Sequence, residues 1–168
     1  MSNYNLIVLS YHRFTDESHP YAFSRTYDQF EYDVNKKCYD WITIDDGHAS
    51  IIKACDIMRA ANVRAKLFIP TSLVGTPGYC NWEDLIKLSR YHDIENHSHL
   101  HIRLPELPRS IIWESMSMAH GMITENIKRA PRYFVPPYNQ FDERIDEMAN
   151  DLELSPLKDR ITIKNDSK

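Results

Sequence analysis

The sequence predicts an α/β domain built on a parallel sheet, and two observations carry the prediction. Short apolar runs rich in β-branched residues, such as 6–9 and 41–44, alternate with longer segments whose apolar residues recur at helical spacing. Acidic and histidine-rich stretches follow directly after several of these runs. Because strands that alternate with helices form right-handed βαβ units, their carboxyl ends meet at one edge of the sheet, where such folds bind ligands.

The elements follow in order along the chain. In the first half we expect a buried strand at 6–9, a mostly irregular segment at 14–37 with one helical turn near 27–34, a strand at 41–44, a helix at 49–62 and a strand at 63–69. Asn81 is the expected N-cap of a helix through 88, and a brief strand follows at 93–96. In the second half we expect a helix at 112–127, a strand at 132–135, a helix at 141–154 and a last strand at 159–165.

Chain length, composition and net charge limit the functions that this protein could have. The 168 residues, 42% of them hydrophobic, suffice for one domain, and we expect 1–168 to form it. A net charge of -4 gives no basic footprint for nucleic acid, so the expected partner is a small or neutral molecule. The first residues carry no basic leader, and the run 6–9 is too short for a signal peptide or membrane span, which makes the cytoplasm the default location.

The three cysteines are widely spaced and form no CxxC pair. We therefore expect buried thiols at Cys38, Cys55 and Cys80, without disulfides or a cysteine zinc site.

Two polar groups carry the chemistry. Asp45 and Asp46 follow the strand at 41–44, and His97 and His101 follow the strand at 93–96. Two imidazoles, one carboxylate and an open position for water are typical of catalytic zinc, which makes Asp46, His97 and His101 candidate ligands. Asp45 cannot point to the same place as its neighbour and is the candidate base.

Each group also has a structural interpretation. Asp-Asp-Gly after a strand is usually a turn, and a lone pair of histidines four residues apart is often a surface feature. Together, at the ends of neighbouring strands, they favour a metal site.

The sequence Thr43-Ile44-Asp45-Asp46-Gly47 resembles the Thr-Phe-Asp-Asp-Gly motif of the polysaccharide deacetylase family, carbohydrate esterase family four. The sequence His97-Ser98-His99-Leu100-His101 resembles its His-Ser/Thr-x-x-His motif, and the similarity extends over about 11–152. The resemblance implies a distorted (β/α) barrel, incomplete if the last strands are missing, that removes acetyl groups from N-acetylated or O-acetylated sugars. It implies Asp45 as base and zinc, or else cobalt or nickel, held by Asp46, His97 and His101.

A third segment, Phe134-Val135-Pro136-Pro137-Tyr138-Asn139, is similar to the family's Phe-Arg-Pro-Pro-Tyr-Gly motif, which builds one wall of the groove. The resemblance implies substrate-binding roles for Pro136, Pro137 and Tyr138, although the prolines serve equally well as a strand stop. The Tyr138 backbone N–H is the candidate catalytic donor to the oxyanion. Val135 stands where the family has the arginine that orients the aspartate, and Asn139 where it has glycine.

The general acid is harder to assign. The family's last motifs, a hydrophobic wall and a Leu-x-His sequence that carries the acid, have no match after residue 154. The candidates for the acid are then His12 and His48, which lie at strand ends, and His99, which points away from the ligands if its segment is helical. A histidine in the position of His12 or His48 is more often a polar loop residue than a catalyst.

The predicted function is metal-dependent deacetylation of a carbohydrate at a C–N bond other than a peptide bond. Two alternatives stay open. One is a module of the same fold that binds metal and carbohydrate without turnover, and the other is an amidase of a small non-sugar amide. An open barrel edge would need cover, and a homodimer is one way to provide it.

Overall fold

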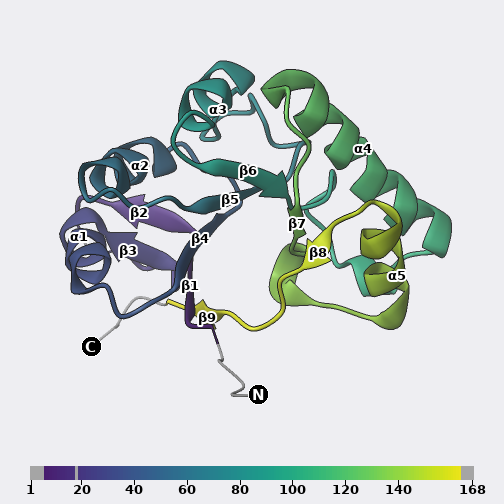
Figure 1. The fold of residues 1–168 in the computed structure, drawn as a ribbon, viewed down its shortest axis with the longest axis horizontal. Helices are drawn as coiled ribbons and strands as arrows, with labels where there is room; N and C mark the ends of the chain where they lie inside the picture. The colour runs from purple at the N-terminus through teal and green to yellow at the C-terminus, as the bar shows by residue number, and fades with distance from the viewer. Residues whose placement is uncertain (1–5, 18, 164–168) are drawn as a thin grey trace.

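The computed structural model describes residues 6–17 and 19–163, and its centre is a parallel sheet curled into a half-barrel (Figure 1). The sheet has seven strands in the order β8-β7-β6-β5-β4-β1-β9. These strands are β1 (Val8–Tyr11), β4 (Trp41–Asp45), β5 (Lys66–Ile69), β6 (Asp93–Asn96), β7 (Tyr133–Phe134), β8 (Ser155–Pro156) and β9 (Ile161–Thr162). The predicted distorted and incomplete (β/α) barrel is thereby confirmed.

The helices pack around the outside of the curved sheet (Figure 1). They are α1 (Tyr27–Lys36), α2 (Ile51–Ala60), α3 (Trp82–Leu88), α4 (Arg109–Ile127) and α5 (Glu143–Asp151). Short 3-10 turns lie at Leu104–Glu106 and Pro137–Asn139. Asn81 caps α3 as predicted, because its side chain accepts the Asp84 N–H while the Asp84 side chain accepts the Asn81 N–H.

Between 13 and 37 the sequence prediction is wrong in part. Instead of loop with one helical turn, the chain forms a second, two-stranded sheet of β2 (Arg13–Thr15) and β3 (Ser24–Thr26), and then the ten-residue helix α1. Thr26 caps α1 through a capping box with Gln29, and Phe30 and Val34 are buried on one face of the helix. The predicted last strand is shorter than 159–165, and its positions 164–165 lie outside the described residues.

Two apolar cores hold the sheet in place. The larger lies between α1, α2, α3 and the central strands, and the smaller joins α4 and α5 to β7. Burial of one large aliphatic or aromatic side chain contributes about 1.5–3 kcal/mol, so the fully buried Ile42, Ile44, Leu67 and Ile69 fix β4 and β5 firmly. The carboxyl ends of these strands are therefore a rigid platform for the polar residues that follow them.

Cys55 and Cys80 are buried free thiols, as predicted, whereas Cys38 is free and exposed. Among the described helices, none is long and apolar enough to cross a membrane.

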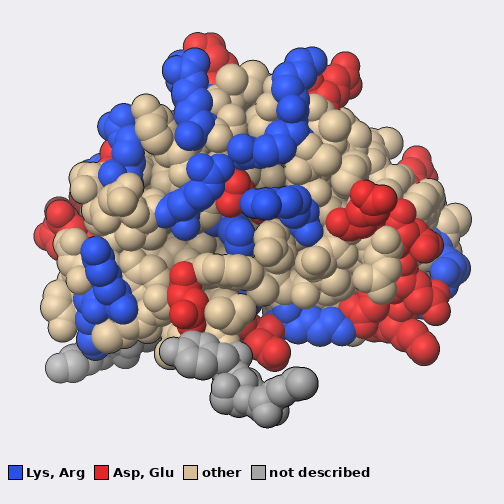
Figure 2. Space-filling model, viewed as in Figure 1, with Lys and Arg blue, Asp and Glu red and all other residues tan. Residues whose placement is uncertain are grey.

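Positive charge gathers on the face of the molecule shown in Figure 2. At the amino end of β6, four basic side chains lie within 4 Å of the Asp93 carboxylate: those of Arg64, Lys66, Arg129 and Arg132. Although burial favours the neutral form, the hydrogen bond from Arg64 and the surrounding cations hold the pKa of Asp93 below its usual value. These basic residues lie at the opposite end of the strands from the carboxylates and histidines described next.

Candidate active site

The two acidic residues at the end of β4 point in different directions because the backbone turns sharply between them. Asp46 has φ 72° and Gly47 has φ 67°, both in the left-handed region. A Cβ on Gly47 would lie 3.1 Å from the Ile69 side chain, so the turn packs closely against β5. Asp45 is thereby left buried at the strand end, while Asp46 is presented to the loop after β6.

The structure brings Asp46 together with both predicted histidine ligands. Asp46 Oδ1 lies 2.9 Å from His101 Nε2 and 3.5 Å from His97 Nε2. One ligand atom of each residue lies within 4.8 Å of the others, and among the described residues this is the single cluster of three such side chains. The distances suit a divalent cation bound between two imidazoles and one carboxylate.

His97 is held in one orientation by its other ring nitrogen. Its Nδ1 lies 2.6 Å from the Val135 carbonyl oxygen, which can only accept, so Nδ1 carries a proton and Nε2 is the nitrogen that faces Asp46. Asn96 fixes the same loop, because its Oδ1 accepts from Ser98 N–H and its Nδ2 donates to the Met116 carbonyl of α4. The first histidine is therefore positioned by β7 and α4 together.

The carboxylate of Asp46 and the imidazole of His101 beside it stabilise each other's charged forms. Although burial favours the neutral carboxyl, hydrogen bonds from His101 and His97 hold the pKa of Asp46 well below its usual range. Burial also opposes a charge on His101, but the hydrogen bond with Asp46 outweighs it and raises the pKa of the imidazole. The site thus favours a cationic partner for Asp46.

Asp45 faces an arginine that the sequence interpretation missed. Arg160 Nη1 lies 2.8 Å from both carboxylate oxygens of Asp45, and both side chains are 3% exposed. The same nitrogen lies 3.1 Å from Ser10 Oγ and 3.3 Å from Thr43 Oγ1, and Nη2 lies 3.3 Å from Asn139 Oδ1. The aspartate predicted to act as base therefore has an arginine partner from residue 160 instead of residue 135.

Of the three histidines considered for the general acid, the structure places one in the pocket and turns two away from it. His12 follows β1 and lines the same pocket, with Nε2 3.9 Å from Asp45 Oδ2. His48 turns away to the Ser50 hydroxyl, 2.8 Å from its Nδ1, and His99 turns away to the Thr71 hydroxyl at 2.8 Å. The segment that holds His99 is a loop and not a helix.

One pocket of about 160 Å³ is lined by the side chains of His12, Asp45, Asp46, His97, His101 and Arg160. Its lining also includes the aromatic residues Tyr21, Phe23 and Tyr138. Pro136 and Pro137 are buried and do not belong to the described lining, which argues against the predicted substrate wall. Asn139 N–H donates to the Pro136 carbonyl at 3.0 Å, so the prolines hold the turn that places Tyr138 beside His101.

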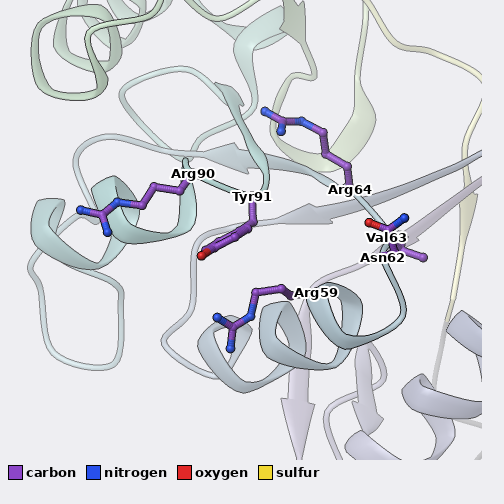
Figure 3. A pocket seen from close by; sticks show the side chains of 6 residues that line it. All are labelled: Arg59, Asn62, Val63, Arg64, Arg90 and Tyr91. Carbon is purple, nitrogen blue, oxygen red and sulfur yellow. The ribbon is translucent and has the colours of Figure 1, made fainter.

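A second hollow, of about 250 Å³, lies near the amino ends of β5 and β6 (Figure 3). Arg59 and Tyr91 face each other across it, with the guanidinium carbon 5.2 Å from the ring centroid. Its described lining contains no carboxylate or histidine, so the chemistry belongs to the first pocket.

Comparison with known proteins assigns the fold. The chain is similar to the Streptococcus pyogenes deacetylase PplD in complex with acetate, at 14% identity over 88% of this chain and 80% of that one, with a TM-score of 0.82. It is also similar to IcaB from Ammonifex degensii, at 19% identity, 96% and 88% coverage and a TM-score of 0.79. A family 4 carbohydrate esterase from Streptomyces lividans matches at 19% identity, 71% and 61% coverage and a TM-score of 0.58.

No curated protein is significantly similar to the chain in sequence. The sequence profile of the family described as polysaccharide deacetylase, however, matches residues 32–157, well over half of the chain, including all three motif segments. The chain belongs to the polysaccharide deacetylase family.

Proposed function

We propose that this protein is a metal-dependent hydrolase that removes acetyl groups from N-acetylated or O-acetylated sugars. The observation that carries the proposal is the pocket in which Asp46, His97 and His101 converge with a second, buried carboxylate, Asp45, beside them. A cation site next to an independent carboxylate is the arrangement that metal-assisted hydrolysis requires.

The residues present fit a divalent cation. Asp46, His97 and His101 would hold it, and the proton on His97 Nδ1 leaves Nε2 available as a ligand. Nitrogen-rich donor sets of this kind suit zinc, with cobalt or nickel as alternatives. When bound, the cation supplies polarisation of the acetyl carbonyl and a water whose pKa is lowered toward about 7.

The chain's own side chains then move the protons. Asp45 takes a proton from the attacking water, whose oxygen adds to the acetyl carbon, and the backbone N–H of Tyr138 donates to the oxyanion. His12, which lines the pocket with Nε2 3.9 Å from Asp45 Oδ2, gives a proton to the leaving nitrogen as the C–N bond breaks. The products are acetate and a free amine, or an alcohol where the acetyl group was an ester.

The pocket fits the acetylated end of a sugar and not a large apolar ligand. Its volume of about 160 Å³ is small, and aromatic rings form part of its lining. Aromatic faces combine an apolar surface with a polar edge, which suits the alternating CH and OH groups of a sugar ring. Tyr138 lies directly beside the cation site, with its ring centroid 5.2 Å from that of His101.

The test is acetate release from N-acetylglucosamine oligomers by protein loaded with zinc or cobalt. We expect turnover that disappears after chelation, returns on addition of metal and is lost in Asp45→Asn. Bound metal and bound sugar without acetate would show a binding module instead. Turnover of simple amides in preference to the oligomers would show an amidase of another substrate class.

A further inference from the structure

The segment between β8 and β9 reaches across the open side of the half-barrel and places an arginine in the pocket. β8 pairs with β7 at one edge of the sheet, and β9 pairs with β1 at the other. Arg160 directly precedes β9, and its guanidinium touches Asp45. We propose that Arg160 is the positioning residue for Asp45, so that the segment around β9 completes the catalytic site. The inference rests on the proposed function of Asp45 as base.

The contacts of Arg160 come from several parts of the fold. Besides Asp45, the guanidinium bonds with hydroxyls of β1 and β4 and with the Asn139 side chain, and it lies 5.7 Å from the Phe68 ring centroid. A planar guanidinium held on several sides presents its N–H groups in fixed directions. An aspartate bonded to such a group through both oxygens is restricted in its rotation, which is what a base needs in order to face one water molecule.

Two departures from the family motif fit this arrangement. Val135 is fully buried and carries no guanidinium, so position 135 supplies no cationic partner for Asp45. Asn139, in place of glycine, supplies the oxygen that lies 3.3 Å from Arg160 Nη2. A guanidinium from residue 160 fits both changes, because Asp45 then needs no arginine at position 135 and Asn139 binds the guanidinium.

The register of β9 sets the position of the arginine. Ile161 and Thr162 pair with Leu9 and Ser10, and Ile163 N–H donates to the Ser10 carbonyl at 2.8 Å. The residue before the first paired position therefore lies level with the start of β1, and its long side chain reaches the Ser10 hydroxyl. A strand that slipped by one residue would turn its side chains to the opposite face and remove the guanidinium from Asp45.

The experiment compares Arg160→Gln and Arg160→Lys with the wild type, each loaded with zinc. The matched control is Lys158→Gln, which removes the 2.6 Å ion pair with Asp146 from the same segment without touching the pocket. We expect Arg160→Gln to lower kcat by about 10²-fold, since misplacement of a catalytic group by about 1 Å costs that much. KM and zinc content should stay within twofold, Arg160→Lys should recover part of kcat, and Lys158→Gln should match the wild type.

A second readout separates positioning from folding. Because Arg160→Gly leaves the space of the guanidinium open, the proposal requires millimolar guanidinium ion to restore turnover in that variant, which a structural role would not. Retention of more than half of kcat in Arg160→Gln, or loss of zinc and folding together in both Arg160→Gln and Arg160→Lys, would overturn the proposal.

If the wild type releases no acetate, the proposed function fails and the structure of Arg160→Gln decides the inference separately. A turned Asp45 carboxylate then supports positioning by Arg160. An unmoved one refutes it.

Discussion

Replacement of Asn96 by alanine tests how firmly the histidine loop is held. Asn96 is fully buried at the end of β6, with Oδ1 2.8 Å from Ser98 N and Nδ2 3.0 Å from the Met116 carbonyl. Ser98 is itself buried and has φ 63°, a conformation that costs a residue with a Cβ roughly 1–2 kcal/mol. The asparagine side chain is thus the local partner that stabilises a strained turn next to His97.

The cost follows from these two bonds. A buried donor left without a partner costs about 1–3 kcal/mol, and Ser98 N–H falls at the upper end because it lies in the interior. The Met116 carbonyl lies within α4 and keeps its helical bond, so it adds a smaller amount. The expected loss in the free energy of unfolding is about 2–4 kcal/mol. For a domain of this size that corresponds to a fall in Tm of roughly 5–15 °C.

Urea unfolding followed by circular dichroism measures this loss, and Asn126→Ala is the matched control. Asn126 Nδ2 also donates to a carbonyl of α4, that of Met122 at 2.8 Å, but no buried N–H within the described ranges donates to its side chain. We expect Asn126→Ala to cost less than about 1 kcal/mol. The reasoning is refuted if the two variants differ by less than about 0.5 kcal/mol, which is the ordinary range for a surface substitution.

Further outcomes are expected at other positions. Asp45→Asn should lower kcat for acetate release by about 10²–10⁴-fold while zinc binding, measured by chelator competition, stays unchanged. Loss of the hydrogen-bond partner of a metal ligand weakens metal binding by roughly 10- to 100-fold, and His101→Gln, which removes a ligand itself, should weaken zinc binding by more than that. The control is His48→Gln, which should leave zinc binding unchanged because the His48 side chain faces Ser50. Burial lowers the pKa of His92 from its usual 6.5, so the folded chain favours the neutral ring and the free energy of unfolding falls as pH drops below 6.5. His92→Gln should reduce that fall between pH 7.5 and 5.5 in urea titrations, and an equal fall in both proteins would contradict the assignment.

The central part of the fold follows from the sequence because its elements have strong local signals. The brief strand at 93–96 and the helix capped by Asn81 appear where the pattern predicted them. β2 and β3 lack such a signal, since each has three residues in a polar segment and is stabilised by pairing with the other. Short parallel strands of this kind depend on tertiary contacts that no local pattern contains.

The candidate site likewise contains residues that the sequence could predict and one that it could not. The sequence could predict that Asp46, His97 and His101 come together, because they follow strands of one parallel sheet, whose carboxyl ends lie at the same edge. In the structure these strands are β4 and β6, with β5 between them. The place of Arg160 could not be predicted, because its partner Asp45 lies 115 positions away and the strand that it precedes is two residues long. The available signal was the alternation Arg160-Ile161-Thr162-Ile163, which indicates a strand but not the edge of the sheet to which it is added.

The hydrogen bond between His97 Nδ1 and the carbonyl oxygen of residue 135 has an evolutionary consequence. Every amino acid carries that oxygen, so substitution of the side chain at 135 does not by itself remove the partner of the histidine. An arginine could therefore be exchanged for valine there without direct damage to metal binding, provided that a guanidinium reached Asp45 from elsewhere. Main-chain support of one function thus leaves the side chain at the same position free to vary.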